Sequence, residues 1–345
     1  MIRRLYLLFI LLGFLIQACA PATVPAATST PTLASPPTAI LTPTLPPPTA
    51  EVFLPTSTPL PPKPINRVML ITFDGLRPDA IEAADMKNLK ALMQTGAYTL
   101  SAQTIIPSLT LPAHASMVTG TCPAKHIVRW NEYVPENGFA LGTDIFDLAH
   151  AAGLRTVIVA GKEKLRHLTE PGSTDYFGFV DITDRFKDAI PLESMAIEQL
   201  RQDFGLMLMH FPDGDIAGHE FGWMSKQQLS AYKRDDDNLG LFIEILKSRN
   251  IFNDTLFIIT SDHGGHDSTH GTDLPEDLTI PWIISGPQIV PGELQTPIYI
   301  MDTAATIAFA LGLPMQLEWE GSPVYEAFGL PVDPLQQRGC LGTTP

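Results

Sequence analysis

Cysteine is scarce in this sequence: the 345 residues include only Cys19, Cys122 and Cys340. No two of them have the close spacing of a zinc-finger pair, so any bound metal ion must be held by histidine and carboxylate side chains. Cys122 and Cys340 could pair in an oxidising compartment. The sequence does not say how far apart their Cα atoms lie, so a disulfide and two free thiols both stay open.

Basic residues are also few, with 22 Lys and Arg against 37 Asp and Glu and a formal net charge of −15. A surface this acidic argues against nucleic acid as a partner, because phosphate backbones are bound mainly by positive charge. Small phosphorylated substrates remain possible, since a local site can be positive within a negative protein.

The longest apolar run near the N-terminus, Leu5 to Ile16, is short for a bilayer span. It follows Arg3 and Arg4 and precedes Ala18-Cys19, which is the pattern of a secretory signal. Residues 16–19 (Ile-Gln-Ala-Cys) resemble the lipobox of a bacterial lipoprotein, although Gln17 is not the usual small residue. We expect a signal peptide over residues 1–18 and a lipid on Cys19, which would place the protein outside the cytoplasm, anchored to the cell-envelope membrane. An ordinary signal peptide or an uncleaved anchor is the alternative.

Residues 19–64 have almost no charge and hold 14 of the 32 prolines. Such a segment buries too little apolar surface to fold and favours extended polyproline II, so we expect a disordered Pro/Thr-rich linker. Residues 65–345 are then enough for one large domain.

Short apolar runs in this domain end abruptly at polar residues. The runs are Arg67 to Phe73, Arg155 to Ala160, Gly205 to Phe211 and Thr255 to Thr260. They alternate with helical patterns at Met86 to Gln94, Asp144 to Ala152, Leu192 to Phe204 and Ser225 to Ser248. This alternation predicts an α/β fold with a doubly wound, mostly parallel sheet sandwiched by helices. In such sheets ligands bind at the carboxyl ends of the strands.

Polar residues suited to metal binding fall at these strand ends or in the loops beside them. They are Asp74, Thr110, Asp215, His219, Asp262, His263 and His270. Each alone is more often a cap, a turn residue or a surface histidine. Together, three carboxylates and three imidazoles are enough for two divalent ions. Asp213 competes with Asp215, but its spacing to His219 is less suitable.

These segments resemble the alkaline phosphatase superfamily, and most closely its type I phosphodiesterase/nucleotide pyrophosphatase branch. The resemblance implies that Asp215, His219 and His270 hold one metal ion. It implies that Asp74, Asp262 and His263 hold a second, with Thr110 coordinated there as the nucleophile. Zinc is the ion that we expect, although the ligand types do not separate it from manganese. The chemistry implied is hydrolysis of phosphate esters through a phospho-threonine.

Other residues are expected to contact the substrate. Asn131 stands where the family places an asparagine on a phosphoryl oxygen, and backbone amides after Thr110 would add to that stabilisation. Lys162 and Lys164 resemble a lysine pair of superfamily members that act on monoesters or phosphonates; a solvated surface cluster is the alternative. His114 and His266 are expected to support the site without binding metal.

Two other functions compete with hydrolysis. The phosphoryl group could pass to an alcohol on an envelope lipid or glycan, or the fold could serve binding alone. The second requires missing ligands, and all seven positions are filled. A sulfatase is excluded because its Cys/Ser-x-Pro-x-Arg motif is absent, and a phosphoglycerate mutase would use serine and would not be exported.

Overall fold

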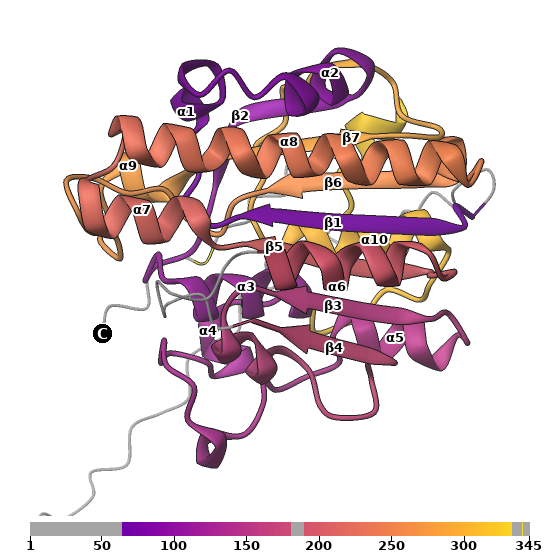
Figure 1. The fold of residues 1–345 in the computed structure, drawn as a ribbon. Helices are drawn as coiled ribbons and strands as arrows, with labels where there is room; N and C mark the ends of the chain where they lie inside the picture. The colour runs from indigo at the N-terminus through magenta and orange to yellow at the C-terminus, as the bar shows by residue number, and fades with distance from the viewer. Residues whose placement is uncertain (1–63, 181–189, 333–339, 341–345) are drawn as a thin grey trace, which may run out of the picture. The chain divides into compact units, whose positions relative to one another are not determined.

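The structure, a computed structural model, describes residues 64–180, 190–332 and 340 (Figure 1). The predicted signal peptide and all of the predicted linker except residue 64 lie outside the described residues. Within the described ranges, no helix has both the length and the apolar character needed to cross a bilayer.

The described residues form one sheet with the strand order β4-β3-β5-β1-β6-β7-β2-β8. The strands are β1 (Arg67–Phe73), β2 (Ala97–Gln103), β3 (Thr156–Ala160), β4 (Tyr176–Phe179), β5 (Leu206–Phe211), β6 (Thr255–Thr260), β7 (Thr279–Ser285) and β8 (Gly292–Glu293). The five strands from β4 to β6 run parallel, whereas β7 is antiparallel to both of its neighbours. The predicted mostly parallel sheet is therefore confirmed.

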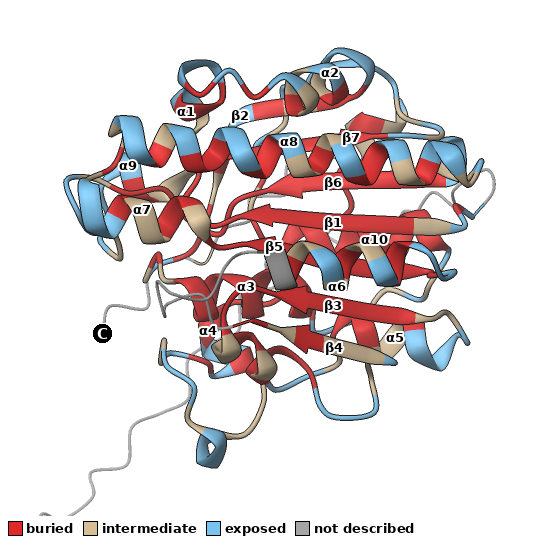
Figure 2. Cartoon of the chain, viewed as in Figure 1, coloured by how far each residue is buried: buried red, intermediate tan, exposed pale blue. Residues whose placement is uncertain are grey.

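Helices cover both faces of the sheet, as Figure 1 shows. On β1, Val68 and Leu70 belong to one apolar cluster while Met69 and Ile71 belong to the other, because successive side chains of a strand point to opposite faces. One face packs against α1 (Pro78–Ala83), α2 (Lys87–Thr95), α6 (Ile190–Leu200), α7 (Asp213–Phe221) and α8 (Lys226–Ser248). The other packs against α3 (Thr110–Thr119), α5 (Ile145–Ala151) and α10 (Asp302–Leu311). Figure 2 shows the resulting buried central strands.

The remaining short helices are α4 (Pro123–His126), α9 (Pro275–Leu278) and the 3-10 turns Pro135–Asn137, Glu163–Leu168, Phe252–Asp254 and Tyr325–Phe328. The predicted helix over Leu192 to Phe204 ends earlier, at Leu200. Phe204 is buried in the same apolar cluster as α6, so its apolar character extends the helical pattern beyond the helix itself.

A disulfide joins Cys122 to Cys340. Cys122 follows α3, and its backbone N–H donates to Glu320 Oε2 at 2.6 Å. Lys125 Nζ donates to the carbonyl of Glu318 at 2.7 Å, so the same short stretch is tied to the C-terminal part of the domain twice more. The sequence left open whether Cys122 and Cys340 form a disulfide or stay as free thiols, and the structure has the disulfide.

Candidate metal and phosphoryl-transfer site

Three neighbouring parallel strands, β5, β1 and β6, end at the same edge of the sheet. Asp74 directly follows β1, and Asp262 and His263 come two and three residues after β6. Asp215 lies in the first turn of α7, which follows β5. Parallel strands bring these side chains together because their carboxyl ends meet at one edge. The polar residues therefore gather at the carboxyl ends of the strands, where the sequence predicts the site.

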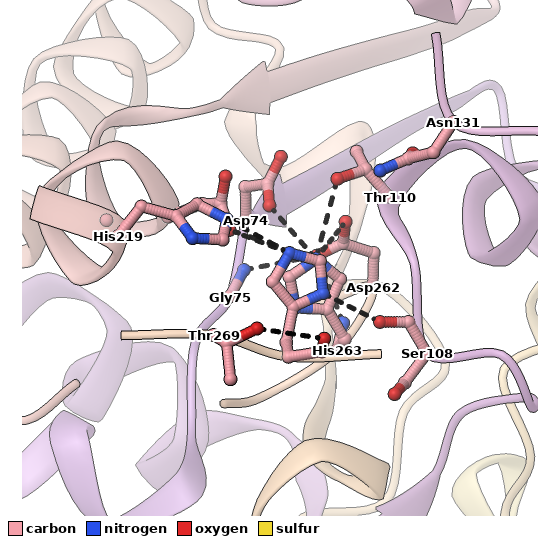
Figure 3. A network of polar contacts seen from close by, with 12 residues as sticks. Asp74, Gly75, Ser108, Thr110, Asn131, His219, Asp262, His263 and Thr269 are labelled. Atoms are coloured by element: carbon pink, nitrogen blue, oxygen red, sulfur yellow. Dashed lines mark hydrogen bonds and ion pairs between the residues drawn. The ribbon is translucent and has the colours of Figure 1, made fainter. Parts of the chain in front are cut away.

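The other predicted residues reach the same point from loops and helix starts. His219 lies one turn beyond Asp215 in α7, His270 lies in the loop before α9, and Thr110 begins α3. Figure 3 shows Asp74, Thr110, Asp262 and His263 gathered in one network of polar contacts, with His219 beside them. The structure thus brings all seven predicted positions together.

Each of the three carboxylates has one oxygen bonded to the protein and one oxygen free. Asp74 Oδ2 accepts from His210 Nε2 at 2.8 Å, and Asp262 Oδ1 accepts from the His263 N–H at 3.0 Å. Asp215 Oδ2 accepts from Lys162 Nζ at 2.6 Å. The buried atoms Asp74 Oδ1, Asp215 Oδ1 and Asp262 Oδ2 have no hydrogen-bond partner among the described residues. Buried polar atoms are rarely left unpaired in this way, so these three oxygens fit a bound cation.

The three histidines are oriented in one common way. His219, His263 and His270 each place Nδ1 within 3.1 Å of a backbone carbonyl, those of Ser268, Gly264 and Ser108 respectively. A ring nitrogen beside a carbonyl must carry the hydrogen, so in each neutral ring Nε2 is left as a lone pair. Nε2 is also the atom that faces the carboxylates, at 3.4 Å from Asp215 for His219 and 3.5 Å for His270. This is the arrangement of imidazoles that bind a metal ion.

Two sets of ligand atoms lie within 4.8 Å of one another: those of Asp74, Asp262 and His263, and those of Asp215, His263 and His270. His219 joins the second set, because its Nε2 lies 3.2 Å from that of His270. Burial raises the pKa of Asp262, and the charge of Asp74 adds to this, so that the pKa reaches about 7. A positive charge beside Asp262, such as a divalent ion supplies, would keep this carboxylate ionised together with Asp74.

Thr110 lies beside these sets, with its hydroxyl buried. Its Oγ1 is 3.5 Å from His263 Nε2 and 3.4 Å from Lys162 Nζ. The Asn131 side chain accepts the Leu111 N–H through Oδ1 at 2.9 Å, which leaves its Nδ2 hydrogens as donors beside Thr110 (Figure 3).

The prediction that backbone N–H groups after Thr110 would help to stabilise a phosphoryl oxygen is wrong. The Leu111 N–H is used by Asn131, Pro112 has none, and the Ala113 N–H donates to the Leu109 carbonyl. Proline inside the first turn fits a helix start, but it removes the donor that the site would have needed.

Lys162 is more deeply placed than the sequence suggested. It follows β3, is only 6% exposed, and its Nζ lies 2.6 Å from both Asp74 Oδ2 and Asp215 Oδ2. Burial lowers the pKa of Lys162, but the charges of Asp215 and Asp74 outweigh burial and raise it above its usual value. Burial likewise raises the pKa of Asp74 and Asp215, yet the Lys162 charge holds both below their usual range. Lys162 is therefore a charged ammonium that connects a carboxylate of each set.

Lys164 lines a cleft of about 610 Å³ that opens on the site. The cleft is lined by Asn131, Glu132, Tyr133, Lys162, Glu163, Lys164, Asp215, Ile216, His219 and Glu220. Burial, and then the charge of Lys162, lowers the pKa of Lys164. The two lysines thus differ: one touches the carboxylates and the other forms the wall of the cleft.

His114 and His266 lie where supporting residues were expected. His114 Nδ1 donates to the Thr110 carbonyl at 2.9 Å, and its Nε2 accepts from Thr72 at 3.0 Å. His266 Nδ1 lies 2.7 Å from Asp277 Oδ1, which ties together the loop that carries His270.

Two further residues beside the site were not predicted from the sequence. Trp223 packs edge-on against His219, with ring centroids 5.2 Å apart, and its Nε1 donates to the Gly75 carbonyl at 3.0 Å. His210 lies within β5 and contacts Asp74. A histidine inside an apolar run has no sequence signal that separates it from an ordinary core residue.

The chain is similar in sequence to two curated proteins. The catalytic subunit of human GPI ethanolamine phosphate transferase 2 is 26% identical over 286 residues, which are 78% of this chain and 28% of that protein. The venom phosphodiesterase of Naja atra is 27% identical over 216 residues, which are 57% of this chain and 26% of that protein. The chain therefore spans about a quarter of the length of these relatives.

A solved structure shares the fold. Murine ectonucleotide pyrophosphatase/phosphodiesterase 5 superposes with a TM-score of 0.62 at 16% identity, covering 76% of this chain and 99% of that one. Residues 68–279, more than half of the chain, match the family described as type I phosphodiesterase/nucleotide pyrophosphatase. With the strand-end carboxylates and histidines in place, the chain belongs to the type I phosphodiesterase/nucleotide pyrophosphatase family.

Proposed function

We propose that this protein is a metal-dependent hydrolase of phosphate esters and that Thr110 is its nucleophile. The observation that carries the proposal is the convergence of three free carboxylate oxygens and three imidazole Nε2 atoms beside the Thr110 hydroxyl. Membership of the family supports the same reaction class.

The residues fit two divalent ions, which we propose to be zinc. Asp215, His219 and His270 would hold one, and Asp74, Asp262 and His263 would hold the other together with Thr110. When bound, such ions lower the pKa of a coordinated hydroxyl and neutralise charge on the phosphoryl oxygens and the leaving oxygen.

The chain's own groups then act in order. Thr110 releases its hydroxyl proton to solvent, and its Oγ bonds to phosphorus as the bond from phosphorus to the leaving oxygen breaks and that oxygen takes up a proton. A water oxygen later displaces Thr110 Oγ, which regains a proton as phosphate or a phosphate ester is released. Asn131 Nδ2 donates to a phosphoryl oxygen, since its Oδ1 is already fixed by the Leu111 N–H. Lys162 Nζ, 3.4 Å from Thr110 Oγ1, places a positive charge at the attacking oxygen.

Lys162 favours one substrate class within this proposal. A phosphomonoester is a dianion, whereas a diester or pyrophosphate linkage carries one negative charge at the reacting phosphorus. A fixed ammonium beside the nucleophile compensates the extra charge of the monoester. Lys164 in the cleft wall adds a second positive group. We therefore include monoesters among the substrates, beside the diesters and pyrophosphates that the names of relatives indicate.

Transfer to an alcohol is the second candidate. The similarity to a human ethanolamine phosphate transferase extends over 78% of this chain, further than the similarity to the venom enzyme. The same phospho-threonine would then be attacked by a lipid or glycan hydroxyl in place of water. Export, lipid attachment at Cys19 and a Pro/Thr-rich linker over residues 19–64 would hold the catalytic domain near such acceptors at the membrane.

The experiment compares p-nitrophenyl phosphate and bis-p-nitrophenyl phosphate as substrates of the metal-loaded protein. Thr110→Ala is the test variant, and Thr119→Ala is its control, because Thr119 ends the same helix and bonds the Ala115 carbonyl away from the site. We expect turnover that is lost in Thr110→Ala and kept in Thr119→Ala. Full activity of Thr110→Ala, or no metal-dependent turnover of either ester, would refute the proposal. Products formed with added alcohols separate transfer from hydrolysis.

A further inference from the structure

His210 is a fully buried polar residue in the middle of the sheet, next to the site. It lies in β5, opposite Thr72 of β1 on one side and Ala160 of β3 on the other. Asp74 comes two residues after Thr72, and the Gly161-Lys162 turn directly follows Ala160. The ring therefore sits between the two backbone segments that carry Asp74 and Lys162.

Two hydrogen bonds define the state of the ring. The Gly161 N–H donates to Nδ1 at 3.0 Å, so Nδ1 must be a lone pair. The single ring hydrogen is then on Nε2, which donates to Asp74 Oδ2 at 2.8 Å. This is the opposite tautomer to that of the three candidate ligand histidines. His210 donates a hydrogen bond to a carboxylate, whereas those histidines present a lone pair that can bind a cation.

Each bond fixes one part of the site. The bond to Oδ2 turns the Asp74 carboxylate so that Oδ1, which has no partner, is the atom directed at His263 Nε2, 3.4 Å away. The bond from Gly161 holds a turn that is already close-packed, because a Cβ on Gly161 would clash with the Pro212 ring. Lys162 leaves this turn and bonds the same Oδ2 atom.

We propose that His210 is a positioning residue that orients Asp74 for the metal ion and, through Gly161, holds Lys162 at the nucleophile. This inference rests on the proposed function, since it assigns His210 to the ion that Asp74, Asp262 and His263 would bind. A buried histidine that merely satisfies the core would stabilise the fold without any preference between the two ions.

Side-chain amides can test the two bonds separately. In His210→Gln the amide nitrogen stands near the position of Nε2 and keeps a donor for Asp74. In His210→Asn the amide oxygen stands near Nδ1 and keeps only the acceptor for Gly161. His210→Phe removes both. The matched control is His126→Phe, because His126 is equally buried, accepts the Val128 N–H at 3.1 Å and bonds Ser116 at 2.9 Å away from the carboxylates.

The measurement is zinc binding by competition with a chromophoric chelator, which needs no catalytic turnover. We expect two ions per chain in the wild type and in His126→Phe. In His210→Asn and His210→Phe, one of the two should bind about 10- to 100-fold more weakly, while His210→Gln should stay within about threefold of the wild type. Melting temperatures show whether each variant is folded.

Two results would overturn the proposal. One is the binding of both ions by folded His210→Phe as tightly as by His126→Phe. The other is equal loss of affinity in His210→Gln and His210→Asn, because the donor to Asp74 would then be irrelevant. If the protein binds two zinc ions but hydrolyses no ester, the proposed function fails while the role of His210 in metal binding can still be judged.

Discussion

The Nε2 atoms of His219 and His270 face each other at 3.2 Å, and both rings have their Nδ1 beside a backbone carbonyl. With Nδ1 as the donor in each ring, two lone pairs meet and repel. A cation between them would remove the repulsion. The two histidines therefore fit one candidate metal site.

Removing divalent ions should destabilise the protein. An ion whose free concentration is about 100 times its dissociation constant stabilises the folded state by roughly 2.7 kcal/mol, so a chelator should lower the melting temperature by about 5–11 °C. Zinc should restore it. His270→Ala should respond less to both, whereas His150→Ala, whose side chain is 44% exposed and lies away from the site, should respond as the wild type does. An unchanged melting temperature with chelator would count against the site.

The two lysines should differ in their effect on substrate choice. In Lys162→Met, loss of the ammonium beside Thr110 should reduce monoester turnover by about 10²-fold or more and diester turnover by less. Lys164→Met should reduce either by under about tenfold, because Lys164 lines the cleft without contacting the carboxylates. Steady-state kinetics with both p-nitrophenyl esters measure the ratio. Equal losses for the two esters in Lys162→Met would show that the ammonium does not select the substrate.

Asp144 should give the protein a pH-dependent stability. It caps α5 by accepting the N–H groups of Phe146 and Asp147, while burial, and then the charge of Asp147, raises its pKa to about 7. The raised pKa means that the folded state holds a proton that the unfolded state releases. The stability from this group is therefore full below about pH 4 and is lost as the pH rises to about 7.

Asp144→Asn keeps the accepting oxygen and removes the titration. Its stability relative to the wild type should increase between pH 5 and pH 8 by roughly 1–3 kcal/mol. Urea unfolding at the two pH values measures this difference, with Asp254→Asn, in an exposed turn, as the control. A difference that does not change with pH would contradict the prediction.

The disulfide should matter for stability more than for catalysis. Cys340→Ser should lower the free energy of unfolding by roughly 2–4 kcal/mol, the typical contribution of a disulfide. Turnover at 25 °C should stay near that of the wild type, since Cys122 follows the far end of α3 from Thr110. Addition of a reductant to the wild type should reproduce the loss of stability, and a large loss of turnover would show that the pairing also shapes the site.

The sequence predicts the buried parallel strands best. The bounds of β1 and β6 are those expected, because both strands are covered on two faces and read as unbroken apolar runs. Strand β2, near the edge of the sheet, is harder to predict from the sequence. Leu100 and Ser101 lie on its exposed part, so its apolar pattern is weak. Helix α7 gives little helical signal, since Gly214 and Gly218 replace the apolar residues that would mark its buried face.

The candidate ligands could be found because polar residues at strand ends stand out against apolar runs. The groups that orient them do not stand out. His210 is surrounded by apolar residues of its own strand, and only the register with β1 and β3 shows that its two ring nitrogens reach Asp74 and Gly161. The depth of Lys162 likewise depends on how three separate strand ends meet, which local sequence does not contain.

The spacing of the three carboxylates has its origin in the sheet. Asp215, Asp74 and Asp262 follow adjacent strands, and adjacent strands are held about 4.8 Å apart by main-chain hydrogen bonds, which most side-chain substitutions leave in place. The backbone of the sheet thus sets the distance between the three carboxylates. This strand arrangement is retained through extensive sequence divergence, as the shared fold at 16% identity illustrates. Residues of the cleft wall that do not contact the carboxylates, such as Glu132, Tyr133 and Lys164, can therefore change without altering the spacing of the three carboxylates.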